Sequence, residues 1–175
     1  DAVIKQYGAV RAKTTEEMID IAYAAQPGIY PTGRKLGVVT ISGGAGVLIA
    51  DDAADYGLDV SPMPEDAQAE MKALLPFAAP RNPVDVTAQA FNDLSLISAF
   101  LKKMIERGGY DAILAFWTSV AGSKMIAGAL QDAMRAGLAD NPDVLILQSI
   151  LAEPEIVASY ERQGYPVFED PTRAV

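Results

Sequence analysis

The sequence contains no histidine and no cysteine. Without cysteine the chain has no disulfides and no thiol nucleophile, which is typical of cytoplasmic proteins, and we expect that localisation. Without histidine it lacks the most frequent general base and metal ligand. A zinc site has no suitable ligands here, and Mg²⁺ would need a substrate phosphate to complete its coordination. We therefore expect neither a metal site nor a catalytic residue in this chain.

Positive charge is scarce and scattered. The 175 residues include 14 Lys and Arg against 23 Asp and Glu, a formal net charge of −9, and the basic residues form no stripe. This charge argues against nucleic acid as a partner. No apolar run reaches the roughly 18 residues of a membrane span, so we expect no membrane partner either. An anion that binds so acidic a protein must be held locally, by backbone N–H groups.

Aromatic residues make up only 7% of the chain, but half of its residues are hydrophobic and 21% are charged, as in globular domains. Apolar runs at residues 36–41, 112–116 and 144–147 lack alternation, which is typical of strands buried on both faces. Two shorter candidate strands, residues 58–60 and 166–168, each follow a helix and a glycine that suits a helix C-cap.

Helical patterns fill the gaps between these strands, at residues 15–25, 46–56, 64–75, 93–107, 123–136 and 154–163. Strands that alternate with helices predict an α/β fold, in which helices cover both faces of a parallel sheet. The expected architecture is a flavodoxin-like three-layer sandwich with a five-stranded parallel sheet in the order 2-1-3-4-5. Its ligand site would lie at the carboxyl ends of the strands.

Both ends of the sequence are atypical of a complete domain. Residues 1–7 have the pattern of a helix tail capped by Gly8, and residues 1–13 have no place in the predicted sheet. Residues 170–175 correspond to the first turn of a helix. We therefore divide the chain into a remnant of a preceding domain, residues 1–13, and one flavodoxin-like domain with a truncated last helix, residues 14–175.

The first candidate ligand site is a glycine-rich turn between the first strand and the following helix. It reads Ser42-Gly43-Gly44-Ala45-Gly46, and we name these five residues as candidate phosphate-binding residues. The free N–H groups of a first helical turn and the positive end of the helix dipole both favour an anion there. A tight turn that uses glycine only for packing explains the same residues equally well.

The turn matches none of three known patterns. A dinucleotide fingerprint needs glycine where Ile49 stands. A P-loop needs Gly-Lys-Ser/Thr before the helix, which is absent. A hydrolase nucleophile elbow needs glycine in place of Thr40, two residues before Ser42. By elimination, an anion at this turn would be bound by a short phosphate-binding loop that follows none of these three patterns.

The second candidate is the loop Arg81-Asn82-Pro83-Val84-Asp85-Val86-Thr87. Pro83 disfavours the helical region for the residue before it, so we expect Asn82 to be extended. The side chains of Asn82, Asp85 and Thr87 would then form a pocket wall beside the glycine turn. The alternative is an Asn-Pro turn between two helices, in which Asp85 and Thr87 act as local caps.

Three groups of polar residues are weaker candidates. Asp51, Asp52 and Asp55 lie in one predicted helix, where a solvent-exposed face explains them better than a metal site. The segments Trp117-Thr118-Ser119 and Gln148-Ser149 follow two predicted strands at the edge where ligands bind. Each of these two segments forms either part of a site or a plain polar turn.

Two blocks of the sequence resemble a known family. They are GRKLGVVTISGGAGVLIADDAADYGLDV, residues 33–60, and LLPFAAPRNPVDVTAQA, residues 74–90. Together they resemble the last flavodoxin-like domain, the ligase-CoA domain, of the nucleoside-diphosphate-forming (ADP-forming) acyl-CoA synthetases, which are relatives of succinyl-CoA synthetase. The resemblance covers residues 12–175 and is carried by a T-x-x-G-G-x-G-V turn and an N-P-V-D-V-T motif.

The resemblance implies an activity. Family members convert an acid, CoA and ATP to acyl-CoA, ADP and phosphate through an acyl phosphate, and a phosphohistidine on a mobile loop carries the phosphoryl group. In that family the phosphohistidine lies between the N-termini of two helices, one from each of two flavodoxin-like domains. The helix that begins near Gly46 would be one of this pair, with Asn82 and Asp85 shaping the pocket.

The resemblance also implies partners outside this chain. ATP or ADP, Mg and CoA would belong to the parent enzyme, with its CoA-binding, phosphohistidine and ATP-grasp domains, and none would bind this domain directly. With no histidine to phosphorylate, the domain would be inactive alone and would meet phosphate or the phosphohistidine loop of a partner. Ile41 replaces the asparagine that is usual in the family's turn, which removes any polar contact of that side chain.

Two alternative interpretations keep the fold. In one, the chain is a non-catalytic synthetase-like region of a protein acetyltransferase, which senses acyl-CoA or holds an oligomer together. In the other, it is a free-standing module for a small phosphorylated ligand. A histidine in a loop upstream of residue 1, or a fused acyltransferase domain, would distinguish the synthetase from the acetyltransferase.

Overall fold

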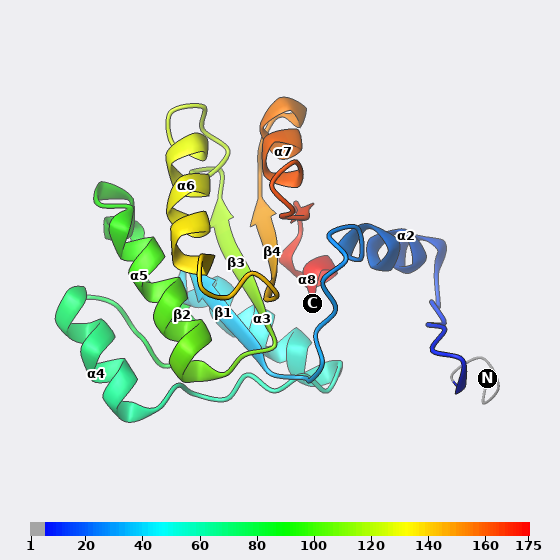
Figure 1. Cartoon of the computed structure of the whole chain (residues 1–175), viewed down its shortest axis with the longest axis horizontal. Coiled ribbons are helices and arrows are strands. Elements are labelled where there is room, and N and C mark those ends of the chain that lie inside the picture. Colours follow the sequence, from blue (N-terminus) through cyan, green and yellow to red (C-terminus); the bar gives the residue numbers. More distant parts are fainter. Residues whose placement is uncertain (1–5) are drawn as a thin grey trace.

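The computed structural model describes residues 6–175, which form an α/β sandwich of three layers (Figure 1). The central sheet has five parallel strands in the order β2-β1-β3-β4-β5. The fold class and strand order expected from the sequence are therefore confirmed. The strands are β1 (Leu36–Thr40), β2 (Val84–Asp85), β3 (Ala112–Thr118), β4 (Leu145–Ile150) and β5 (Val167–Phe168).

The central strands are buried on both faces. Every residue of β1 and of β4 is buried. β1 pairs with β3 in continuous register, from Leu36 opposite Ala112 to Thr40 opposite Phe116. Burial on both faces explains why these segments are apolar runs without alternation.

Helices connect the strands and lie close to the predicted ranges. α5 and a π-helical turn, η2, together cover the helix predicted at 93–107, and α6 begins at Ala127 rather than at residue 123. A short 3-10 helix, η1, precedes α5. The helices are α2 (Thr15–Ala24), α3 (Gly43–Asp55), α4 (Glu65–Leu74), η1 (Ala88–Asn92), α5 (Ser95–Lys103), η2 (Met104–Gly108), α6 (Ala127–Leu138), α7 (Pro154–Glu161) and α8 (Pro171–Ala174).

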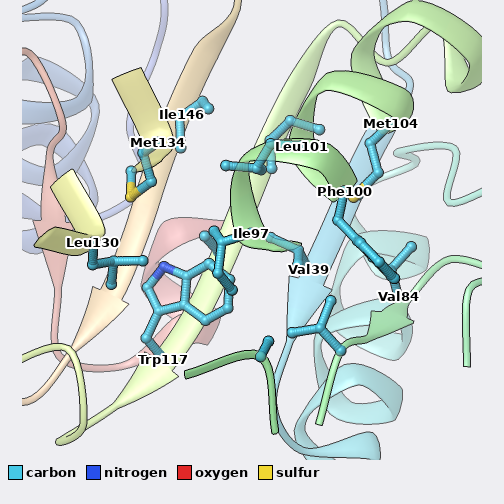
Figure 2. Close-up of a cluster of buried hydrophobic side chains, with 14 of the residues drawn as sticks. Val39, Val84, Ile97, Phe100, Leu101, Met104, Trp117, Leu130, Met134 and Ile146 are labelled. Atoms are coloured by element: carbon cyan, nitrogen blue, oxygen red, sulfur yellow. The ribbon is translucent and has the colours of Figure 1, made fainter. Parts of the chain in front are cut away.

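Two hydrophobic cores hold the helices to the sheet. The larger core lies under α4, α5, α6 and α7, and Figure 2 shows part of it, with Ile97 of α5, Trp117 of β3 and Leu130 of α6. The smaller core lies on the opposite face, where Ile49 of α3 and Ala174 of α8 contact the sheet. Ile49 is completely buried, which contributes about 1.5–3 kcal/mol to holding α3 in place.

The second strand is not the one predicted from the sequence. Residues 58–60 form only a single bridge, in which Asp59 lies opposite Lys35. The strand beside the carboxyl half of β1 is Val84–Asp85, within the segment predicted as a loop. The prediction was wrong because a two-residue strand directly after Pro83 is too short to show any strand pattern.

Helix α2 lies at the edge of the domain opposite α4 (Figure 1) and has no buried residue. Tyr23 connects α2 to β5 and α7. Its hydroxyl accepts a hydrogen bond from the N–H of Val167 (2.9 Å) and donates one to Glu161 (2.6 Å). Arg173 of α8 forms a salt bridge with Asp20 of α2 (2.6 Å). These few polar contacts connect α2 to the end of the sheet.

The two ends of the chain match the expected local structure only in part. Residues 171–174 form the single-turn helix α8, as predicted for the carboxyl end. Most of the helix tail predicted at residues 1–7 lies outside the described residues, so the domain division at residue 13 stays a prediction. No helix within residues 6–175 has both the length and the apolar character required to cross a membrane.

Candidate functional site

The glycine turn begins where β1 ends. The side chain of Thr40 stabilises the turn with two hydrogen bonds to Ser42. Its hydroxyl accepts one from the N–H of Ser42 (2.9 Å) and donates one to the carbonyl of Ser42 (3.1 Å). Ser42 is extended, with φ −141° and ψ 111°, and α3 starts at the next residue, Gly43. The N-terminus of α3 therefore lies at the carboxyl edge of the sheet, where ligands of such folds bind.

The first turn of α3 is uncapped. The side chain of Ser42 makes no cap hydrogen bond, and the turn carries no acidic residue. Within residues 6–175, the N–H groups of Gly43, Gly44 and Ala45 have no acceptor, whereas that of Gly46 donates to the carbonyl of Ser42 (3.1 Å). Three free donors at the positive end of a 13-residue helix are suited to an anion.

The three glycines of the turn differ in how close their neighbours lie. A Cβ on Gly46 would lie 2.9 Å from the Cβ of Pro83, closer than real side chains approach. A Cβ on Gly43 would lie 3.3 Å from Oδ2 of Asp85, and one on Gly44 would have nothing within 4 Å. The packing explanation therefore holds for Gly46, and the anion explanation stays a prediction for the other residues of the turn. Gly46 serves packing, while the exposed Gly43 and Gly44 leave their N–H groups open.

Asp85 lies beside the turn. It pairs with Thr40 in the sheet, its Oδ2 faces Gly43, and its Oδ1 accepts a hydrogen bond from the N–H of Thr87 (2.8 Å). Thr87 has φ 54°, a rare value for a β-branched residue, and its hydroxyl caps η1 by accepting from Gln89 (3.3 Å). Both side chains therefore make local caps, and Asp85 also adds negative charge next to the free N–H groups.

Asn82 points into the sheet. It is only 5% exposed. Its Oδ1 accepts a hydrogen bond from the N–H of Val38 (2.8 Å), and its Nδ2 donates to the carbonyls of Leu36 and Ser61, each at 3.0 Å. Its φ is 78°, not the extended value expected before Pro83, and asparagine tolerates this region because its carboxamide binds nearby backbone. Asn82 can therefore contribute to a pocket wall only through the residues that follow it.

Trp117 and Thr118 belong to β3, and Gln148 and Ser149 belong to β4, whereas Ser119 lies in the turn that follows β3. Nε1 of Trp117 donates a hydrogen bond to Oε1 of Gln148 (2.8 Å), and both side chains are fully buried. Nε2 of Gln148 has no acceptor among residues 6–175. Both predicted strands ended too early, because a tryptophan and a glutamine interrupt their aliphatic pattern. These side chains line the core.

A large groove of the domain lies away from the glycine turn. Its volume is about 510 Å³, and Tyr23, Phe168 and Arg173 are among the residues that line it between α2, β5 and α8. No cluster of three or more acidic side chains within residues 6–175 is arranged to hold a metal ion. The glycine turn is not part of the lining of this groove, and its Gly43 and Gly44 are exposed.

Relatives of this chain share both its sequence and its fold. The alpha subunit of the ADP-forming acetate–CoA ligase II of Pyrococcus furiosus is 39% identical over 92 residues, which are 51% of this chain and 20% of that protein. The alpha subunit of ligase I of the same organism is 26% identical over 175 residues, covering 99% of this chain and 38% of that protein. The matched segments therefore make up between a fifth and two fifths of the length of these relatives.

Two solved structures have the same fold. A crystal structure of a protein from Pyrococcus horikoshii OT3 superposes with a TM-score of 0.83 at 26% identity, covering 98% of this chain and 40% of that one. The dinucleotide-forming acetyl-coenzyme A synthetase 1 of Ca. Korarchaeum cryptofilum, in complex with phosphate and ADP, gives a TM-score of 0.78 at 26% identity, covering 99% and 38%. The family profile of the Ligase-CoA domain matches residues 36–163. The chain thus belongs to the Ligase-CoA domain family, as its two sequence blocks predicted.

Proposed function

We propose that this chain is a domain of an ADP-forming acyl-CoA synthetase and that it stabilises a phosphoryl group with the N-terminus of α3. The observation that carries the proposal is the open first turn of α3, where Gly43, Gly44 and Ala45 have no acceptor for their N–H groups within residues 6–175. The relatives support it, because two are named ADP-forming acetate–CoA ligases and a similar structure holds phosphate and ADP.

The reaction of the whole enzyme would convert an acid, CoA and ATP to acyl-CoA, ADP and phosphate through an acyl phosphate and a phosphohistidine. In each transfer the phosphoryl group carries its negative charge on oxygens that face the protein. Backbone N–H groups at a helix N-terminus stabilise that charge, and they are oriented before the phosphoryl group arrives. A local site of this kind suits a chain with net charge −9, whose overall field repels anions.

The carrier of the phosphoryl group must come from outside this chain, because the chain has no histidine. The phosphohistidine loop of a neighbouring domain would bring its phosphoryl group to the first turn of α3. CoA, ATP or ADP, and Mg would be bound by the CoA-binding and ATP-grasp domains of the parent enzyme, not by this domain. Alone, the domain would therefore form no acyl-CoA from acid, CoA and ATP.

A titration of the isotope-labelled chain with inorganic phosphate tests the proposal by amide NMR. The amide resonances of Gly43, Gly44 and Ala45 are expected to shift together and to saturate, whereas sodium chloride at equal ionic strength leaves them unchanged. The first turn of α4 is an internal control, because Glu65 and Asp66 make it unfavourable for anions. Absence of shifts in α3, or equal shifts in α4, would contradict the proposal, as would acyl-CoA formation by the isolated chain.

A further inference from the structure

Two separate segments form the edge of the sheet beside β1. At the amino end of β1, Asp59 forms a bridge with Lys35. At the carboxyl end, residues 84–85 of β2 pair with residues 39–40. Between these two places neither segment pairs with β1. A side chain forms hydrogen bonds with β1 there instead.

The carboxamide of Asn82 fills the gap. Its Oδ1 accepts a hydrogen bond from the N–H of Val38 (2.8 Å), and its Nδ2 donates to the carbonyl of Leu36 (3.0 Å). The same Nδ2 donates to the carbonyl of Ser61, in the segment that follows Asp59 (3.0 Å). Because a backbone N–H can only donate, the contact with Val38 fixes which way the amide faces. The side chain thus substitutes for a peptide group and ties both edge segments to β1.

The residues that follow Asn82 touch the glycine turn. Pro83 lies against Gly46, because a Cβ on that glycine would be 2.9 Å from the Cβ of Pro83. Oδ2 of Asp85 lies 3.3 Å from the position of a Cβ on Gly43. Asn82 anchors this segment at one end and the pairing of β2 with β1 anchors it at the other. The segment between them is therefore held against α3.

We propose that Asn82 is a positioning residue of the phosphoryl site: its carboxamide holds residues 83–85 against the first turn of α3 and so sets how closely the Asp85 carboxylate approaches the free N–H groups. This inference rests on the proposed function of the α3 N-terminus. Asn82 itself does not touch the phosphoryl group, because it is buried and its polar atoms are bonded to backbone. Tyr110 supports the anchor by donating a hydrogen bond to the carbonyl of Ser61 (2.9 Å).

Three variants separate positioning from general stability. Asn82→Gly removes the carboxamide but tolerates the positive φ, so it adds no backbone strain. Asn82→Asp keeps the size and one acceptor, but it loses both Nδ2 bonds and turns a carboxylate toward two carbonyls. Gln131→Ala is the matched control, because Gln131 is also a buried amide (4% exposed), and it donates to Ser159 (2.7 Å) in the α6–α7 region, away from α3.

The experiment combines each variant with Asp85→Asn and measures phosphate affinity from the amide shifts of the α3 turn. In the wild-type and Gln131→Ala backgrounds, Asp85→Asn is expected to tighten phosphate binding roughly three- to tenfold, since it removes a like charge. In the Asn82→Gly and Asn82→Asp backgrounds the gain should be clearly smaller, because only the pairing of β2 with β1 then holds the carboxylate near α3. An equal effect in all backgrounds, or none in wild type, overturns the positioning role.

Failure of the proposed function would be recognised separately. If phosphate leaves the wild-type α3 amides unchanged, that function fails, and the amide resonance of Gly43 alone then tests the positioning. Asp85→Asn should shift this resonance more in wild type than in Asn82→Gly, and equal shifts overturn the inference.

A measurement on the wild-type chain covers the case in which both Asn82 variants unfold. It follows the exchange of the Nδ2 hydrogens of Asn82 with solvent. Exchange that phosphate speeds supports the inference, because phosphate binds more tightly when the Asp85 carboxylate is not held beside it and therefore favours the opened arrangement. Exchange that phosphate slows or leaves unchanged overturns it.

Discussion

Asp85 faces Gly43 at the start of α3, with its Oδ2 3.3 Å from the position that a Cβ on Gly43 would occupy. A carboxylate at the N-terminus of a helix stabilises it by roughly 0.3–1 kcal/mol. Asp85 therefore acts as an internal anion for α3 while the site is free. An incoming phosphoryl group meets the same negative charge, so Asp85 both supports the helix and weakens the binding of a free anion.

The first prediction concerns this charge. Asp85→Asn keeps the oxygen that accepts from Thr87 but removes the charge beside Gly43. We expect phosphate to bind roughly three- to tenfold more tightly, and the gain to shrink as salt is added. Isothermal titration at low and high ionic strength measures both effects. Asp51→Asn, an exposed position further along α3, is the charge-matched control and should change affinity less than about twofold. Unchanged or weaker binding by Asp85→Asn would refute the repulsion.

The second prediction compares two glycines of the same helix. Gly46→Ala places a Cβ 2.9 Å from the Cβ of Pro83, so the turn must shift, at a cost of about 1–3 kcal/mol. Gly44→Ala meets nothing within 4 Å and gains helix propensity, up to about 1 kcal/mol. Urea unfolding measures both free energies. The packing account of Gly46 fails if the two variants are equally stable.

The third prediction is a loss of stability in alkaline solution. Burial raises the pKa of Tyr110 to about 12, above its ordinary value of 10.0. The unfolded chain then releases this proton at lower pH than the folded one, so the contribution of Tyr110 is complete below about pH 10 and disappears as the pH rises toward 12. Tyr110→Phe should be less stable than wild type at pH 8, because the hydrogen bond to Ser61 is lost, but its stability should fall less between pH 10 and 12. Urea unfolding at several pH values gives the free energy of unfolding of both proteins. If it falls equally in both between pH 10 and 12, Tyr110 is not the group responsible.

The sheet could be predicted from the sequence because its central strands are apolar runs that helices bury on both faces. β1 and β4 are buried at every residue and apolar along most of their length. β2 could not be predicted, because two residues after Pro83 carry no pattern and the gap beside them is filled by a side chain, that of Asn82. A side chain that replaces a peptide group leaves no periodic trace in the sequence.

The sequence was sufficient to place the candidate site at the glycine turn. It was not sufficient to assign the role of each residue in that site. The sequence predicts free N–H groups at a helix start, and the structure distinguishes Gly43 to Ala45, which keep them, from Gly46, which packs on Pro83. Asn82 was expected in the pocket wall because polarity alone does not reveal which way a side chain faces. For the same reason, Trp117 and Gln148 were placed after the strands, in part of a site or in polar turns, although they form a buried pair.

If backbone N–H groups of the α3 turn bind a phosphoryl group, two variants at Gly43 should differ in their affinity for phosphate. Gly43→Pro removes one N–H at the first helical position, where proline is tolerated, and Ser42 before it is already extended. Gly43→Ala adds a Cβ near Asp85 but keeps the N–H, so it controls for that contact.

The measurement is phosphate affinity, followed at the amide of Ala45 in both variants. A lost hydrogen bond to a charged group corresponds to about 1.5–3 kcal/mol, so Gly43→Pro should bind phosphate at least about tenfold more weakly than Gly43→Ala. Gly43→Ala should stay within about twofold of wild type. Equal affinity of the two variants would show that these N–H groups do not hold the phosphoryl group.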